Sequence, residues 1–180
     1  MTQKEKQPIS CQLVYFFLVL CMIACGCAAT MQVTPSLKQV QGVDYQVSGN
    51  VQYDGRKEYL PRSIREEPSV NSPISFQYTA KESHAKDDVP ELCALFNPLT
   101  LVGFPTGKDK LTITSTLTVL QKDQPVRSYT AMCIVEQTRN LFSNPNFSEM
   151  KRDGMIAVRD NIDIQLYNDR DLLTGLAAMP

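Results

Sequence analysis

The alternation of apolar and polar residues predicts two β-strands in the first half of the chain. Residues 45–53 alternate strictly, with aromatic, valine and glycine positions on one face and polar residues on the other. This is typical of a half-buried antiparallel strand. Residues 74–80 alternate in the same way. The charged stretches 56–72 and 81–88 show no such pattern, and we interpret both as exposed connections.

A longer pair of strands is predicted further along the chain. Residues 111–121 carry leucine, isoleucine and valine on one face and a row of threonines on the other. Residues 127–137 follow after a turn at 122–125, so the two segments predict a long hairpin. The second segment is apolar on both faces around Cys133, which places it centrally in the sheet.

The C-terminal part predicts one amphipathic helix. It can begin at Asn144–Pro145 or at Asn146 and runs to about Leu173. Apolar residues recur at spacings of three or four positions: Met155, Val158, Ile162 and Leu166. Charged residues cover the other side: Lys151, Arg152, Asp153, Arg159, Asp160 and Asp163. The expected fold is therefore α+β, with four to five mostly antiparallel strands and one long C-terminal helix packed on one face, over residues 44–175.

Composition excludes some function classes and leaves others open. The chain has 18 basic and 19 acidic residues, so it lacks the positive surface that nucleic acid requires. Its one histidine, His84, lies in the polar stretch 81–88 without a serine or cysteine placed to act as a nucleophile. No hydrolase or metal-site motif is present. We therefore expect a protein that is not an enzyme and holds no cofactor or metal.

The N-terminal segment has the pattern of a signal sequence. A short head with two lysines precedes residues 13–25, which carry no charge and are nearly all large and apolar. A positive head, an apolar stretch and then small residues are typical of a secretory signal peptide. A membrane-spanning helix needs about 20 apolar residues, so an uncleaved anchor is a second interpretation. A buried core helix is a third interpretation, although this run contains no polar residues at helical spacing to form a solvent-exposed face.

Two cysteines follow small residues where the apolar run ends. Ala24–Cys25 and Gly26–Cys27 each resemble the lipobox of bacterial lipoproteins, although neither carries the usual leucine three residues before the cysteine. The resemblance implies that one cysteine is acylated and becomes the new N-terminus. Residues 1–26 would then be the signal peptide. Residues 27–43 would form a tether, although its start could pair at a sheet edge.

Counting cysteines favours Cys27 slightly over Cys25 as the acylated residue. Cleavage before Cys27 leaves Cys93 and Cys133 as an even pair, whereas cleavage before Cys25 leaves an odd thiol. Parity and export together predict a disulfide between Cys93 and Cys133. The clustered N-terminal cysteines have no histidine or acidic neighbour to complete a zinc site.

These features predict a membrane-anchored envelope lipoprotein. The small residue after either cysteine, in place of aspartate, implies by resemblance a position on the periplasmic face of the bacterial outer membrane. The lipid bilayer is one expected partner, and an unidentified envelope protein, bound through a sheet edge or helix surface, is the other. An uncleaved signal-anchored protein and an envelope hydrolase are the alternatives.

Overall fold

The computed structural model describes residues 29–38, 45–67, 72–88, 100 and 103–178. The chain divides into two compact units: one contains residues 1–30, 86–109 and 137–145, and the other contains 31–85, 110–136 and 146–180. Among the described residues, no helix is both long enough and apolar enough to span a bilayer.

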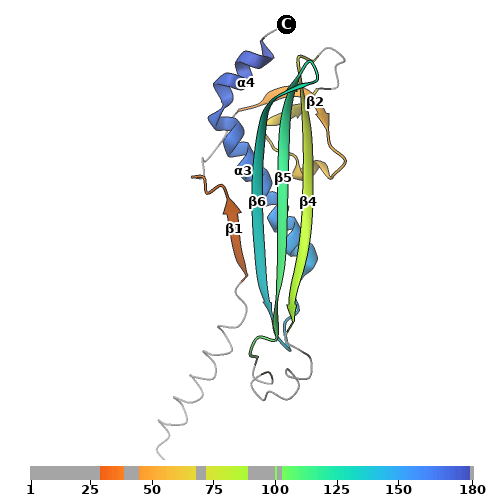
Figure 1. Ribbon diagram of the computed structural model, residues 1–180, viewed down its shortest axis with the longest axis vertical. Coiled ribbons are helices and arrows are strands. Elements are labelled where there is room, and N and C mark those ends of the chain that lie inside the picture. The colour runs from red at the N-terminus through yellow and green to blue at the C-terminus, as the bar shows by residue number, and fades with distance from the viewer. Residues whose placement is uncertain (1–28, 39–44, 68–71, 89–99, 101–102, 179–180) are drawn as a thin grey trace, which may run out of the picture. The chain divides into compact units, whose positions relative to one another are not determined.

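The predicted α+β class is confirmed, with six strands where four to five were expected. The sheet order is β1-β6-β5-β4-β2-β3. The strands are β1 (Thr30–Thr34), β2 (Val47–Gln52), β3 (Ile64–Glu66), β4 (Ile74–Asp88), β5 (Gly107–Gln121) and β6 (Gln124–Arg139). Figure 1 shows the three long strands β4, β5 and β6 side by side. The central position predicted for the second strand of the hairpin is only partly right, because β6 has a neighbour on each side but lies next to the edge strand β1.

The antiparallel direction expected for the strand at 45–53 is wrong. β2 runs parallel to β3, with Val47 opposite Ile64, and parallel to β4, with Val51 opposite Phe76. Alternation reports only which face is buried, and it is the same for either strand direction. The direction is set by the connection from β2 to β3, which includes a short 3-10 helix, η1 (Lys57–Tyr59).

The interpretation of the two charged stretches as exposed connections is wrong, for a different reason in each. Residues 81–88 continue β4, and their side chains are exposed wherever the structure describes them, which removes the alternating pattern. The stretch 56–72 contains η1 and β3, and it buries Tyr59, Pro61 and Ile64. Isolated apolar residues among charges give no periodic signal, although each has a place in the core.

The hairpin at 111–137 is confirmed, with a tighter turn than expected. β5 ends at Gln121 and β6 begins at Gln124. The two turn residues, Lys122 and Asp123, have φ angles of 51° and 62°. Positive φ at both central residues is the signature of a type I′ turn, whose twist matches that of the paired strands.

The predicted C-terminal helix is present but is divided in two. α3 (Phe147–Asn168) begins at Asn146, whose side-chain Oδ1 accepts hydrogen bonds from the N–H groups of Ser148 and Glu149. It ends at Asp169, and α4 (Arg170–Ala177) follows. The Asp169 carboxylate accepts a hydrogen bond from Arg127 Nε at 2.9 Å, which holds the junction against β6.

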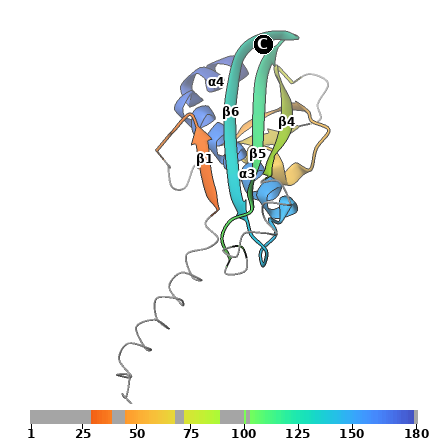
Figure 2. The same cartoon turned by 60° about the horizontal axis from the view of Figure 1, so that its bottom comes forward.

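The core lies between α3 and one face of the sheet, as Figures 1 and 2 show. The predicted apolar stripe of the helix, Met155, Val158, Ile162 and Leu166, is buried there. Two charged residues that were expected on the outer side, Arg159 and Asp163, are also buried. Each faces residues 56–63: Arg159 Nη1 donates to the carbonyl of Glu58 at 2.8 Å, and Asp163 accepts from the N–H of Ser63 at 2.9 Å.

The predicted tether at 27–43 is wrong for residues 30–34, which form the edge strand β1 beside β6 (Figure 2). The alternative that its start pairs at a sheet edge is what the structure shows. Val33 packs against the core. Asn161 of α3 donates a hydrogen bond to the carbonyl of Pro35 at 2.7 Å. The domain therefore begins within a few residues of the two candidate lipobox cysteines.

Candidate binding site

The most distinctive surface of the larger unit is the edge of β4. β2 pairs with β4 only from Ser75 to Gln77. Between Thr79 and Ala85, no other strand of the described chain pairs with β4 on this side. Backbone donors and acceptors at such an edge are free to pair with another extended chain.

A groove of about 730 Å³ lies beside this edge. Residues 79–82 of β4, residues 53–56 and the first two turns of α3 form its walls. Apolar surface comes from Tyr53, Tyr59, Tyr78 and Met155. The Tyr53 and Tyr78 rings pack edge to face with their centroids 5.0 Å apart. Tyr59, Tyr78 and Met155 are buried, so the accessible apolar surface of these four residues comes mainly from the half-buried Tyr53.

Charged side chains border the groove. Lys151 of α3 and Glu82 of β4 form an ion pair at 2.8 Å across it. Arg56, Asp54 and Lys81 also lie along its walls. Because charges of both signs are present, the groove favours a ligand of mixed polarity over a strongly charged one.

The tyrosine hydroxyl in the groove is held in its neutral form. Burial raises the pKa of Tyr78 to about 12, because desolvation disfavours the phenolate. At neutral pH, Tyr78 is therefore uncharged. Its side chain is only 2% exposed and its hydroxyl is buried, so it lies beneath the groove surface.

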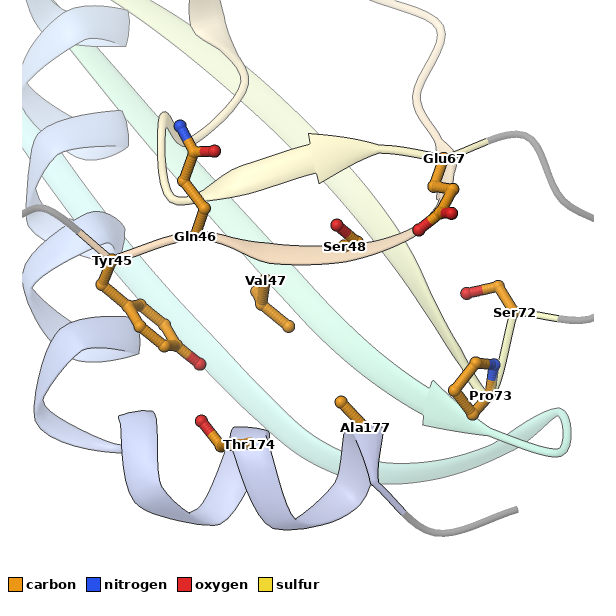
Figure 3. A pocket seen from close by; sticks show the side chains of 9 residues that line it. All are labelled: Tyr45, Gln46, Val47, Ser48, Glu67, Ser72, Pro73, Thr174 and Ala177. Carbon is orange, nitrogen blue, oxygen red and sulfur yellow. The ribbon is translucent and has the colours of Figure 1, made fainter.

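A second, smaller hollow of about 400 Å³ lies between the start of β2 and α4, as Figure 3 shows. Tyr45 and Val47 line one side, and Thr174 and Ala177 of α4 line the other. The Tyr45 hydroxyl donates a hydrogen bond to the carbonyl of Arg170 at 3.4 Å. Burial raises the pKa of Tyr45. The hollow is small and mixed in polarity, and its tyrosine already binds the helix junction.

The predicted acylation sites, Cys25 and Cys27, lie outside the described residues, as does Cys93. Within the described part of the chain, Cys133 has no disulfide partner, and its side chain is fully buried in β6. Burial raises its pKa to about 11. The disulfide between Cys93 and Cys133 stays a prediction.

His84 lies in β4, and the loop expected around it is a strand. Its imidazole packs against the ring of Phe147, with the centroids 4.9 Å apart. Among the described residues, no group of three or more histidine, cysteine, aspartate or glutamate side chains could hold a metal ion. The histidine thus takes part in packing between β4 and the start of α3.

Sequence reasoning missed the groove because it arises from a difference in strand length. Tyr53 and Tyr78 were correctly placed on the inward faces of their strands. The groove exists because β4 continues for 15 residues while β2 stops after 6. A pattern of polar residues without alternation cannot indicate where one strand outruns its neighbour.

No protein-family model and no curated protein matches the sequence. Structural similarity is distant. Rare lipoprotein B from Shewanella oneidensis matches at 9% identity and a TM-score of 0.28, over 62% of this chain and 76% of that one. A SecB-like chaperone from Mycobacterium tuberculosis, solved in complex with a ChAD peptide from the HigA1 antitoxin, matches at 15% identity and a TM-score of 0.31, over 91% of each chain. Similarities this distant carry no argument about what this chain does.

Proposed function

We propose that this protein is a lipid-anchored, non-enzymatic binding lipoprotein of the bacterial envelope, held on the periplasmic face of the outer membrane. The signal-like segment that ends at the lipobox-type cysteines Cys25 and Cys27 supports the anchor. The acylated residue is Cys27, because its use leaves an even number of thiols in the exported chain.

The observation that carries the binding role is the open edge of β4 beside the aromatic groove. An extended segment of an envelope protein adds to this edge as a further strand, and its backbone pairs with residues 79–85. Main-chain hydrogen bonds then give affinity, while side-chain pockets next to the strand give specificity. Tyr53, whose ring packs on the buried Tyr78, lines such a pocket.

The charged residues along the edge fit this role. Lys81 and Glu82 are exposed. Charges on an edge strand oppose indiscriminate pairing between copies of the same protein. They therefore leave the edge available to a partner with complementary charges.

Intact mass of the protein extracted from its native membrane tests the anchor. We expect a chain that begins at Cys27 and carries a diacylglycerol and a further acyl chain. A mass that begins at Cys25 changes only the acylation site. A mass that retains residues 1–24 contradicts the proposal and identifies an uncleaved membrane anchor.

Site-specific photo-crosslinking in living cells tests the binding edge. A photoreactive amino acid is placed at Ala80 or Lys81 of β4, and at the exposed Ser128 of β6 as the matched control. An added strand lies alongside β4 in the plane of the sheet. The side chains of the adjacent positions 80 and 81 lie on opposite faces beside that strand, so both positions should capture the same envelope protein. Capture at position 128 alone, or at only one of the two β4 positions, would contradict strand addition.

A further inference from the structure

The smaller compact unit carries a turn with an unusual composition. Beyond β6, Asn140 and Ser143 pair through two backbone hydrogen bonds of 3.1 and 3.4 Å. The Asn140 Oδ1 also accepts a hydrogen bond from the N–H of Phe142 at 3.0 Å. These bonds define the positions of Leu141 and Phe142 at the apex of the turn.

Large apolar residues are exposed at this apex. Phe142 is 72% exposed and Leu141 is 59% exposed. Phe104, in the neighbouring loop of the same unit, is 42% exposed. The Cδ2 atom of Phe142 lies 4.0 Å from the position that a Cβ on Gly103 would take, so the two loops are adjacent. Turn apices usually carry glycine, asparagine, aspartate or serine, as the Lys122–Asp123 turn at the other end of β6 does in part.

The length of chain between the anchor and the fold identifies what covers this apolar tip. Thr30 begins β1 and belongs to the same compact unit as the tip. Thr30 lies three positions after Cys27, and these three steps span at most about 11 Å when fully extended. Even from Cys25 the distance is at most about 18 Å. An acyl chain on either cysteine therefore keeps this unit at the bilayer surface.

We infer that the Leu141–Phe142 turn, together with Phe104, inserts into the interface of the bilayer that holds the acylated N-terminus. The inference rests on the acylation proposed above. Acyl chains already provide stable attachment, so insertion of the tip fixes the orientation of this unit on the membrane. Large apolar and aromatic side chains are suited to the interfacial layer.

The charges of this unit beyond the proposed anchor predict how insertion depends on lipid composition. By sequence, residues 86–109 and 137–145 contain three basic residues, Lys86, Lys108 and Arg139, and four acidic residues, Asp87, Asp88, Glu91 and Asp109. A set this close to balance gives no net attraction to anionic headgroups. Insertion is therefore expected to be the same in zwitterionic vesicles and in vesicles that contain anionic lipid.

Tryptophan fluorescence tests the inference directly, because the chain contains no tryptophan. The full acylated protein, purified from native membranes, carries Phe142→Trp or Leu141→Trp and is reconstituted into phosphatidylcholine vesicles with or without brominated acyl chains. Val126→Trp in the larger unit is the matched control, because Val126 is also an exposed apolar residue (44% exposed) near a turn. Circular dichroism confirms that each variant is folded.

We expect blue-shifted emission and loss of most of the signal to brominated lipid for tryptophan at 141 or 142, and neither effect at 126. Equal quenching at all three positions would overturn the inference, since it would indicate non-specific adsorption. A blue shift without quenching would also overturn it, by showing that protein covers the tip. The mass of the same sample separates the two proposals. Absence of quenching in an acylated chain rejects insertion alone, whereas a chain without acyl groups rejects the lipid anchor.

Discussion

The carboxylate of Asp163, in the middle of α3, accepts a hydrogen bond from the backbone N–H of Ser63 at 2.9 Å. Its second oxygen accepts another from the N–H of Arg62 at 3.0 Å. Asp163 is only 8% exposed. One side chain thus satisfies two backbone donors just before β3, and it fixes the segment that leads to the parallel strands against the helix.

Replacement of Asp163 by alanine is expected to lower the free energy of unfolding by about 1–3 kcal/mol, because buried N–H groups then lose their acceptor. Urea denaturation measures the change. Asp153→Ala, at an exposed position of the same helix, is the matched control and should have little effect. Equal effects of the two substitutions would contradict the role of Asp163.

The pH dependence of stability should also report on Asp163. Desolvation raises the pKa of this carboxyl above its ordinary value of 3.8, and the hydrogen bonds from Ser63 and Arg62 only partly oppose the shift. The folded state then binds the proton more tightly than the unfolded state. The stabilisation is present below the ordinary pKa and is lost as pH rises through the folded pKa.

Asp163→Asn, which does not titrate, removes this dependence. The stability of the variant relative to the native protein should therefore increase between about pH 3 and about pH 7. Denaturant unfolding of both proteins across that range measures the difference. A difference that decreases with pH would show that the pKa of Asp163 is lowered in the fold.

Gly154→Ala should destabilise the protein by about 1 kcal/mol or more, although alanine favours a helix by a similar amount. A Cβ at this position would lie 2.7 Å from Ile113 Cδ1 and 3.3 Å from Val135 Cγ2. Ile113→Val removes the closer atom, so the double variant should lose less stability than the sum of the two single variants. Strict additivity would contradict the predicted contact.

Tyr129→Phe removes the hydroxyl that donates to Asp169 Oδ2 at 3.1 Å, at the junction of α3 and α4. The expected loss is about 1 kcal/mol, typical of one hydrogen bond. A double-mutant cycle with Asp169→Ala measures the coupling. Absence of coupling would show that the hydroxyl contributes nothing through this carboxylate.

The thiol of Cys133 should resist alkylation in the native protein, because it is fully buried and burial raises its pKa to about 11. Titration of the denatured, unreduced protein then tests the predicted disulfide with Cys93, which would contribute about 3–4 kcal/mol. Absence of free thiols supports the bridge. Two free thiols, one from Cys93 and one from Cys133, would reject it.

The sequence predicted those elements whose burial is periodic. The sequence predicted three strands, around Val47, Phe76 and Ile113, and the apolar stripe of the helix at Ile162. In each of them the apolar residues that recur at regular spacing lie on one face, and that face is buried. The N-terminus of α3 was found because Asn146 can cap a helix. These signals depend only on residues close together in the sequence, so the sequence alone contains them.

The remaining features depend on contacts between distant residues. Asp163 belongs to a charged series on the helix and is buried only because Ser63 and Arg62 supply donors to it. The candidate groove could not be predicted for the same reason. It forms only because β4 continues past the end of β2, a strand that is distant in the sequence from the second half of β4. From the sequence, a glycine at position 154 predicts only a less stable helix. The structure shows that the missing Cβ allows the helix to pack closely on Ile113.

The helix that covers the sheet follows all six strands in the chain, and this affects truncated forms of the protein. The apolar face of β4, β5 and β6 has no cover until α3 supplies Val158, Ile162 and Leu166. A chain cut after β6 would therefore expose most of the hydrophobic surface of its sheet, and exposed apolar surface of this kind drives aggregation.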